Sequence, residues 1–490
     1  MGRVSFSIKE KAAAVFLFMA DLLIMLTVWL GKNYVQVDFD QLLFQVKTSS
    51  EGVHGGLLSS ALIQVGLFSL LMILAEVWLY LHLTGRYHLS FIKTHILLLT
   101  IVMFTTSLFI CGIQVHIFTF LKSESMESDF IQSQYIKPER SILHFPEQNR
   151  NLIYIFLESM ESTFADPSAG NMITDCYIPE LAVLANENLN FSHTDGLGGA
   201  LSYIGTTWTA AAMVAQTAGV PVKVSLEADA YGAGDSFLPG VISIGQILEE
   251  QGYRQVLLLG SNADFHGRDV YFKEHGNYEI LDTEALKKAK RLPANYEVWW
   301  GFEDEVLFSY AREELTRLAE SRKPFNFTML TADTHFPDGY PCRLCEDIYD
   351  IPYANVLACS SRQVADFISW IQEQPFYENT TIIICGDHLT MDGGFMEDID
   401  PDYTRSIYNC FINAAVKPVR EKNRRFGTFD LFPTTLAALG VKIDGERLAL
   451  GTNLFSDRAT LTEQFGYEYL TEELQQQSDF YDYEFLLLSR

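Results

Sequence analysis

The chain has 490 residues, too many for one compact core, and its 35 Lys and Arg against 62 Asp and Glu give a net charge of −27 at pH 7. This balance argues against a nucleic-acid partner, because phosphate backbones are bound by clustered Lys and Arg. It also opposes close approach to an anionic membrane surface unless basic groups or a metal ion lie at the site.

Three apolar stretches, at residues 12–30, 57–83 and 96–118, are each long enough to cross a bilayer, which takes about 20 residues. The first is too long for the core of a signal peptide, and no small-residue cleavage site follows it. We therefore expect residues 1–122 to form a membrane anchor of three transmembrane helices rather than buried helices of a soluble protein.

The basic residues around these stretches predict the topology. Arg3, Lys9 and Lys11 precede the first stretch, and Arg86 and Lys93 lie between the second and the third. Lys and Arg next to a span favour the cytoplasmic side. Three crossings then place everything after residue 122 outside the cytoplasm, so we predict a multi-pass protein of the cell membrane with an extracytoplasmic domain.

Beyond the anchor, the polar residues and prolines of 123–149 predict a linker. Residues 150–455 alternate short apolar runs with helix-length stretches, which is typical of an α/β domain with a mostly parallel central sheet flanked by helices. The tail at 456–490 is rich in Tyr and Glu, and its composition indicates no role.

Four apolar runs of this domain are followed by polar residues that carry chemistry. Glu158 follows 152–157, His266 and Arg268 follow 256–259, His335 follows 327–330, and Asp387 and His388 follow 382–384. In open α/β sheets, ligands bind beyond the carboxyl ends of the strands. We therefore expect these residues to converge on one site.

Glu158, Asp387 and His388 form a suitable oxygen and nitrogen ligand set for Mn²⁺, Mg²⁺ or Zn²⁺. Taken singly, an acid after a strand is more often a helix cap or a solvated turn. Their shared position at strand ends favours a metal site.

The stretch GTTWTAAAM at 205–213 predicts a turn that enters an apolar helix, whose N-terminus favours an anion. A threonine there is a candidate nucleophile, and coordination of Thr209 to a metal ion would lower the pKa of its hydroxyl. The alternative is that Thr206, Thr207 and Thr209 only cap the helix.

Arg268 can hold a phosphate through two N–H groups, and His335 is suited to proton transfer or to binding a phosphoester. The alternatives are a surface salt bridge for the arginine and an ordinary loop histidine. The placement of both residues after strands favours the functional interpretation.

Three of the seven cysteines lie close together in the sequence. Cys342 and Cys345 are two residues apart, but only Cys359 follows at close range, so the second pair expected of a structural zinc site is missing. A local disulfide that involves Cys359 is the better expectation and agrees with an oxidising, extracytoplasmic location.

Taken in order, the motifs resemble the phosphoglycerol transferases of the sulfatase and alkaline-phosphatase superfamily, including lipoteichoic acid synthases. The motifs are NLIYIFLES at 151–159, GTTWT at 205–209, THFP at 334–337, GDH at 386–388 and FDLFP at 429–433. The resemblance covers about 150–455. Lipoteichoic acid synthases usually have five spans and carry a Trp before the Arg of the 265–268 stretch, whereas this chain has three predicted spans and Phe265-His266-Gly267-Arg268.

The resemblance implies that Glu158, Thr209, Asp387 and His388 bind a divalent metal, with Mn²⁺ as the first candidate and Mg²⁺ or Zn²⁺ as alternatives. It further implies that Thr209 attacks the phosphorus of phosphatidylglycerol, releasing diacylglycerol and forming a covalent phospho-threonine. A glycan or polyglycerolphosphate acceptor, of the teichoic-acid type, would then receive the phosphoglycerol. The implied headgroup-binding residues are Arg268, His335 and His266, with Arg268 and His335 also in catalytic roles.

Two rival functions remain open at this point. A phosphoethanolamine transferase of the same superfamily would share the metal ion and the threonine and would differ in the lipid consumed. A non-catalytic membrane receptor for a headgroup or polymer would have no need of a nucleophile beside a metal ion. A true sulfatase is disfavoured, because the chain lacks the Cys/Ser-x-Pro-Ser-Arg segment that this class modifies.

Overall fold

The computed structural model describes residues 6–48, 59–87, 89–169, 175–225, 231–232, 236–296 and 298–487. The chain forms two compact units. The first comprises Met1–Phe39 and Val53–Leu121, and the second comprises Asp40–Gly52 and Lys122–Arg490. A short segment of the predicted anchor, from residue 40 to 52, therefore groups with the second unit.

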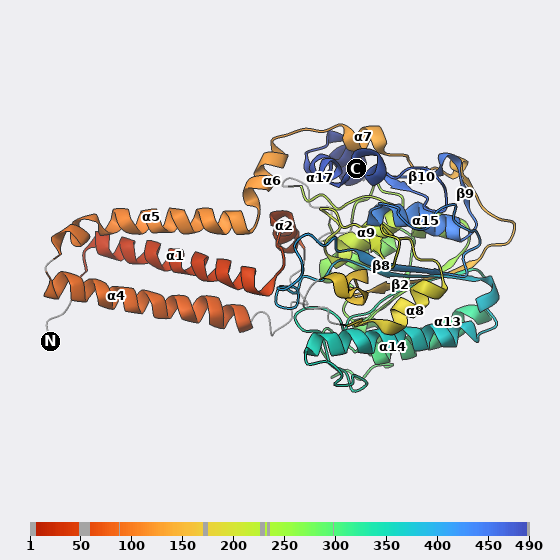
Figure 1. Cartoon of the computed structure of the whole chain (residues 1–490), viewed down its shortest axis with the longest axis horizontal. Coiled ribbons are helices and arrows are strands. Elements are labelled where there is room, and N and C mark those ends of the chain that lie inside the picture. The colour runs from red at the N-terminus through yellow and green to blue at the C-terminus, as the bar shows by residue number, and fades with distance from the viewer. Residues whose placement is uncertain are drawn as a thin grey trace. The chain divides into compact units, whose positions relative to one another are not determined.

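The first unit contains three helices that are long and apolar enough to cross a membrane, as predicted (Figure 1). They are Ile8–Asn33, Ser59–Arg86 and Ser90–Gln114, labelled α1, α4 and α5, and α4 proper (Phe68–Arg86) continues the π-helical turn η1 (Leu62–Leu67). A capping box begins α1, where the Ser7 hydroxyl accepts from the Glu10 amide and the Glu10 carboxylate accepts from the Ser7 amide. Helix α1 packs against both α4 and α5.

The second unit is built on a seven-stranded sheet with the strand order β3-β8-β7-β2-β6-β4-β5. Strands β7, β2, β6, β4 and β5 run parallel, whereas β8 is antiparallel to both β7 and β3. The predicted α/β class with a mostly parallel sheet is therefore confirmed. The strands are β2 (Asn151–Leu157), β3 (Gly199–Ala200), β4 (Arg254–Leu259), β5 (Glu279–Leu281), β6 (Phe325–Leu330), β7 (Thr380–Gly386) and β8 (Ile407–Ile412).

Helices cover both faces of this sheet, and the side chains of β2 show why. Ile153, Ile155 and Leu157 join one buried apolar cluster, while Tyr154 and Phe156 point to the other face and join a second cluster. The first face packs against α8 (Pro179–Glu187), α12 (Thr283–Lys288), α13 (Asp304–Glu320) and α14 (Pro352–Gln372). The second face packs against α9 (Thr209–Ala218), α10 (Ile244–Glu250), α11 (Arg268–Glu274) and α15 (Leu431–Ala438), and Figure 1 shows these two layers.

The segments on either side of the predicted α/β domain are parts of its structure. The linker carries the end of α6 (Ile117–Glu124), α7 (Phe130–Gln134), a 3-10 turn at Arg140–Ile142, and β1 (Leu143–His144), which pairs with β9 (Lys442–Ile443). The tail forms α16 (Leu461–Phe465), α17 (Tyr467–Gln475), α18 (Asp479–Tyr481) and a π-helical turn at Asp482–Leu487. A short hairpin of β10 (Arg447–Leu448) and β11 (Gly451–Thr452) precedes it.

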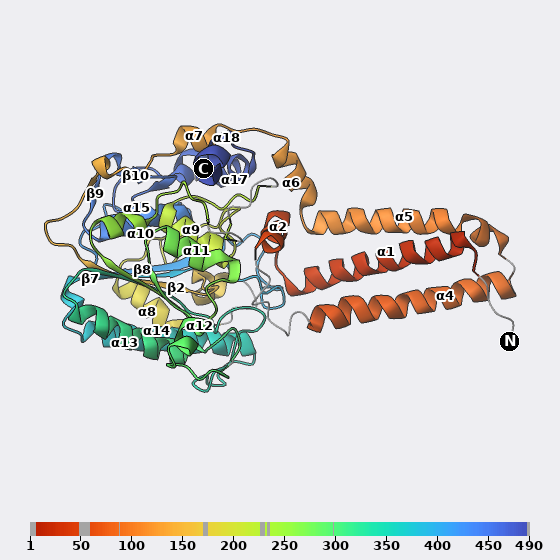
Figure 2. The ribbon, with the colours of Figure 1, turned by 180° about the vertical axis from the view of Figure 1, so that it is seen from behind.

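The tail is held by burial of its apolar side chains. Leu470, Leu474 and Tyr481 are completely buried and belong to the same core cluster as Phe130 of α7. Figure 2 shows α7 beside α17 and α18, and the rings of Phe130 and Phe465 lie 5.2 Å apart. Residues 456–487 are thus an integral layer of the second unit.

Candidate active site

Two parallel neighbours in the sheet, β2 and β7, bring the predicted metal ligands together. Leu157 at the end of β2 is paired in register with Gly386 at the end of β7. Glu158 therefore leaves one strand beside Asp387 and His388, which leave the other. Residues that are about 230 positions apart in the chain become neighbours because the two strands end at the same level.

The side chains of these three residues converge. One donor atom from each lies within 4.8 Å of the others. The Nε2 atom of His388 is 3.5 Å from Oε1 of Glu158 and 3.4 Å from Oδ2 of Asp387. All three side chains are buried, so the two carboxylates and the imidazole face one another away from bulk water.

The surrounding hydrogen bonds determine which atoms of Asp387 and His388 are available to bind a cation. Oδ1 of Asp387 accepts from the backbone amides of Ser159 at 2.8 Å and His388 at 2.7 Å, while Oδ2 accepts no hydrogen bond from any residue that the structure describes. Nδ1 of His388 lies 2.8 Å from the carbonyl oxygen of Leu389, so it carries the proton and leaves the lone pair on Nε2. A carboxylate oxygen without a hydrogen bond, beside an imidazole nitrogen that carries its lone pair, fits a divalent cation.

The electrostatics of the group point the same way. Burial, and then the negative charge of Glu158, raise the pKa of Asp387 to about 7. Burial acts to lower the pKa of His388, but the carboxylates of Asp387 and Glu158 outweigh it and raise that pKa overall. A bound cation would relieve the repulsion between the buried carboxylates.

Thr209 lies at this group, at the first residue of α9. Its Oγ1 atom is 3.4 Å from Oε2 of Glu158 and 3.4 Å from Nε2 of His388. The hydroxyl of Thr206, by contrast, donates to the carbonyl of Tyr203 at 2.8 Å and accepts from its amide at 3.0 Å, which closes the turn before the helix. Of these two threonines, only Thr209 faces the carboxylates and the imidazole.

Arg268 is buried at the start of α11, in the loop region that follows β4. Its Nε donates to the carbonyl of Phe265 at 3.1 Å, and its Nη2 donates to the carbonyl of Asn262 at 2.7 Å and the hydroxyl of Ser261 at 3.2 Å. Within the described part of the chain, no carboxylate forms an ion pair with it. Burial lowers the pKa of Arg268 to about 10, so the guanidinium stays charged and can pair with an anion.

His335 follows β6 and lies close enough to Arg268 and Asp387 for their charges to act on its pKa. Its Nδ1 is 2.7 Å from the carbonyl oxygen of Phe336, so Nδ1 carries the proton and the lone pair lies on Nε2. Burial lowers the pKa of His335 to about 4, so the ring is neutral near pH 7. The ring of Trp300 lies 4.6 Å from that of His335 and 5.7 Å from that of Phe265.

His266 is placed differently from the other predicted residues. Its Nε2 lies 2.6 Å from Oε1 of Gln45, and burial, followed by the positive charge of Arg268, lowers its pKa to about 3. The ring is stacked on Phe265, with 3.9 Å between the ring centroids. His266 is thus a neutral ring whose Nε2 is engaged by another part of the chain.

The domain that carries these residues matches a known family. The family model described as Sulfatase matches residues 150–441, more than half of the chain. The chain belongs to the sulfatase family.

Two relatives narrow the comparison to phosphoglycerol transferases. Phosphoglycerol transferase I of Escherichia coli O127:H6 (strain E2348/69 / EPEC) is 34% identical over 328 residues, which are 65% of this chain and 41% of that protein. The same enzyme from Escherichia coli O81 (strain ED1a) is also 34% identical over 328 residues, with the same coverage. The chain therefore spans less than half the length of these relatives. The predicted resemblance to phosphoglycerol transferases of the sulfatase superfamily is confirmed.

Solved structures support the sulfatase-family fold. A protein of the alkaline phosphatase superfamily from Vibrio parahaemolyticus has a TM-score of 0.50 and 22% identity, covering 64% of this chain and 74% of that chain. The lipoteichoic acid synthase of Listeria monocytogenes has a TM-score of 0.51 and 16% identity, covering 67% of this chain and 80% of that chain.

Two residues of this sulfatase-family site were missed by reasoning from the sequence. Trp300 comes from a separate loop, and its indole lies beside the rings of His335 and Phe265. The 265–268 stretch itself contains a phenylalanine and no tryptophan. The Trp pair at 299–300 was the available signal. Gln45 lies on a helix between the first two predicted spans, and nothing local in the sequence connects it with His266.

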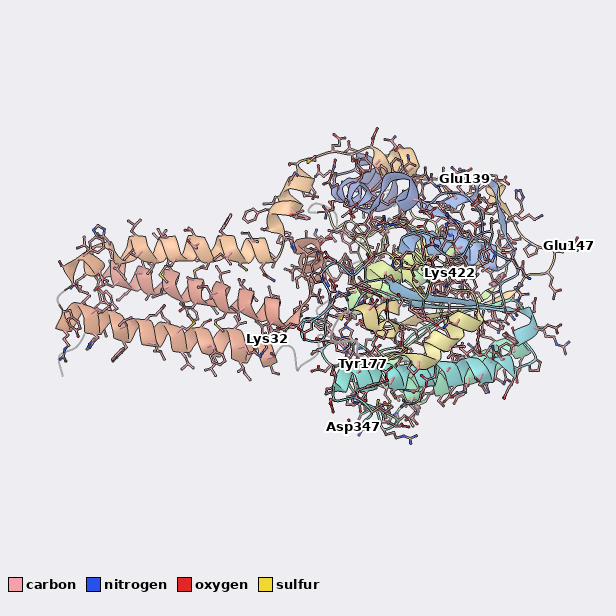
Figure 3. All side chains as sticks on the ribbon, in the orientation of Figure 1. Lys32, Glu139, Glu147, Tyr177, Asp347 and Lys422 are labelled. Carbon is pink, nitrogen blue, oxygen red and sulfur yellow. The ribbon has the colours of Figure 1, made fainter. Side chains whose placement is uncertain are left out.

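The three cysteines singled out in the sequence gather at a separate place. The Sγ atom of Cys342 is 3.8 Å from that of Cys345 and 3.7 Å from that of Cys359. All three are thiols, so the expected disulfide is not formed; a bonded pair would lie about 2.05 Å apart. Asp347, labelled in Figure 3, belongs to the same loop as Cys342 and Cys345.

Proposed function

We propose that this chain transfers phosphoglycerol from phosphatidylglycerol to a glycan or polyglycerolphosphate acceptor, with Thr209 as the nucleophile and diacylglycerol as the first product. The observation that carries the proposal is the position of the Thr209 hydroxyl, 3.4 Å from both Glu158 and His388. The names of the relatives at 34% identity support phosphoglycerol as the transferred group.

Glu158, Thr209, Asp387 and His388 would hold a divalent cation, with Mn²⁺ proposed first. The donor set fits, because Oδ2 of Asp387 and Nε2 of His388 are left available beside the Glu158 carboxylate. When bound, such a cation supplies positive charge that lowers the pKa of a coordinated hydroxyl and offsets the charge of a phosphate.

In the first step, Oγ1 of Thr209 forms a bond to the lipid phosphorus and the bond from phosphorus to the diacylglycerol oxygen breaks. The hydroxyl proton of Thr209 ends on that departing oxygen, so diacylglycerol leaves as an alcohol and phosphoglycerol remains on Thr209. Arg268 holds the non-bridging phosphate oxygens, because it is charged, buried and without a carboxylate partner among the described residues.

In the second step, an acceptor hydroxyl attacks the same phosphorus, and the bond to Oγ1 of Thr209 breaks. The acceptor proton returns to Thr209, which restores the enzyme. His335 is suited to carry the proton at the entering and leaving oxygen, since Nδ1 donates to the Phe336 carbonyl and the lone pair lies on Nε2.

We further propose that the three long apolar helices anchor the protein in the cell membrane with the catalytic domain outside the cytoplasm. The basic residues before the first span and between the second and third spans support this topology. An anchored domain meets lipid headgroups at high effective concentration, so modest intrinsic affinity suffices.

The test uses the full chain in vesicles with Mn²⁺ and a fluorescent phosphatidylglycerol, and it follows diacylglycerol release. Wild type should release diacylglycerol, Thr209→Ala should not, and intact mass should show one added phosphoglycerol on the wild type when no acceptor is present. Release from phosphatidylethanolamine instead would identify the rival transferase. Release from neither lipid, with headgroup binding retained, would favour the receptor.

A further inference from the structure

Helix α2 (Phe39–Lys47) lies between the first two predicted spans in the sequence, yet its part from residue 40 onward belongs to the catalytic unit. Phe44 is 1% exposed. Its ring lies 5.2 Å from Trp208, 5.9 Å from Tyr231, 6.3 Å from Phe237 and 5.2 Å from His266. Phe44 therefore fixes α2 in an aromatic pocket of this unit.

The partners of α2 lie next to the functional residues. Trp208 directly precedes Thr209, and His266 lies two residues before Arg268. Nε2 of Gln41 is 3.5 Å from Sδ of Met391, which is three residues after His388. One short helix thus contacts the loops that carry the nucleophile, the phosphate-binding arginine and a metal ligand.

Gln45 is the residue of α2 that packing alone does not explain. Its Oε1 lies 2.6 Å from Nε2 of His266, but its Nε2 is buried and has no hydrogen-bond partner in the described part of the chain. Nε1 of Trp208 is likewise buried without a partner among the described residues. If the amide were turned round, Oε1 would be the orphan instead, so one polar atom of Gln45 is left for a ligand in either assignment.

Buried polar atoms without a partner are rare in native proteins and mark the place of a missing one. The contact with His266 uses one polar end of the Gln45 amide and leaves the other end without a role in the described fold. The headgroup in the proposed reaction offers acceptors, because phosphate oxygens and glycerol hydroxyls both accept hydrogen bonds. A free N–H of Gln45 suits such a hydroxyl and does not suit an ammonium group, which only donates.

We propose that Gln45 is a specificity-determining residue of the headgroup site, donating from Nε2 to a hydroxyl of the glycerol moiety, and that Phe44 holds α2 in place for this contact. The inference rests on the proposed phosphoglycerol transfer for the identity of the headgroup. It makes α2, which follows the first span in the sequence, a part of the substrate site.

The deciding variants are Gln45→Glu and Gln45→Leu in the full chain. Glutamate keeps an acceptor for His266 but replaces the N–H donor by an anionic oxygen, whereas leucine removes both.

If Gln45 only positions His266, the Glu variant should behave like wild type. If it recognises the headgroup, the Glu variant should lose about tenfold in kcat/KM with phosphatidylglycerol, mainly through KM, and shift its preference toward phosphatidylethanolamine. Val46→Ala is the matched control, since Val46 is 82% exposed on the same helix.

Binding to the inactive Thr209→Ala chain provides a second readout that does not depend on turnover. Titration with a short-chain phosphatidylglycerol should give a Kd about tenfold higher when Gln45→Glu is added, and an unchanged Kd when Val46→Ala is added. A Gln45-dependent Kd without diacylglycerol release by wild type would keep this inference and overturn the proposed function. Equal Kd and equal KM in the Glu variant and wild type, or no binding at all, would overturn the inference.

Discussion

The described residues of the second unit include two compact groups of potential metal ligands, which differ in their donor atoms and in their place in the fold. Glu158, Asp387 and His388 offer oxygen and nitrogen donors at the ends of neighbouring parallel strands. Cys342 and Cys345 lie in a loop and meet Cys359 of α14, so the second group offers only sulfur.

The surroundings of the two groups separate their roles. The first group has the hydroxyl of Thr209 at 3.4 Å, and the charge of Arg268 lies close enough to feel Glu158 and Asp387. The second group has the amide of Gln363, with Nε2 3.5 Å from Sγ of Cys359. We propose that the first group is the reaction centre, because the candidate nucleophile Thr209 and the buried charge of Arg268, which has no ion-pair partner among the described residues, lie beside it.

The largest effect is expected at the nucleophile. Thr209→Ala should lower diacylglycerol release by at least about 10³-fold, because loss of a covalent nucleophile removes the reaction path and not only one contact. Thr209→Ser is the matched control, since it keeps a hydroxyl at the same position and should retain measurable release. Initial rates and the intact mass of the phosphorylated chain check both variants. Full activity of the alanine variant would place the nucleophile elsewhere.

Removal of the metal should have the next largest effect. Chelation should abolish release, and added Mn²⁺ should restore it, if the hard donors of the first group hold the required cation. Asp387→Asn should lower the metal content and the rate about 100-fold, because Oδ2 is the oxygen left without a hydrogen bond among the described residues. Metal analysis of the purified chain measures the first quantity. Unchanged turnover after exhaustive chelation would contradict the assignment.

The substitution Arg268→Lys is expected to lower the rate less than the loss of the Thr209 hydroxyl or the removal of the metal. Lysine keeps the positive charge but loses the planar fork that binds a phosphate through two N–H groups, so kcat/KM should fall about 10-fold to 100-fold. The side chain also loses its bonds to the carbonyls of Asn262 and Phe265, which place the fork. A steady-state comparison should show a further fall for Arg268→Ala. Equal rates for all three forms would assign the arginine to packing alone.

The first group was predictable from the sequence because the pattern that positions its residues is local. An apolar strand followed at once by an acid, repeated along parallel strands, forces Glu158, Asp387 and His388 to one edge of the sheet whatever the remaining contacts are. Other local patterns predicted the fold class, through the alternation of short apolar runs with helix-length stretches, and the three apolar helices, through length and hydropathy.

The rest depended on contacts that no local pattern encodes. Gln45 reaches His266 across more than 200 residues, and α2 has no strand or glycine motif to signal it. The tail looked featureless because Leu470, Leu474 and Tyr481 are spread over short helices, and only the folded core shows that they are buried. The thiols illustrate the same limit, since their spacing alone did not show that Cys342 lies between the other two.

Substitution or oxidation of the cysteines of the second group is expected to have the smallest effect on turnover. Because Cys342 is 3.7 Å and 3.8 Å from its two neighbours, oxidation outside the cytoplasm should form one disulfide that includes Cys342 and leave one thiol. Cys345→Ser should therefore direct the bond to Cys359, closing a loop that stabilises the fold by about 3 kcal/mol. Alkylation with and without reductant counts the thiols, and thermal unfolding measures the stability.

Release of diacylglycerol should stay within about twofold of wild type, because the sulfur atoms touch none of the reacting groups. A loss of turnover as large as that of Asp387→Asn would instead join the thiols to the reaction centre.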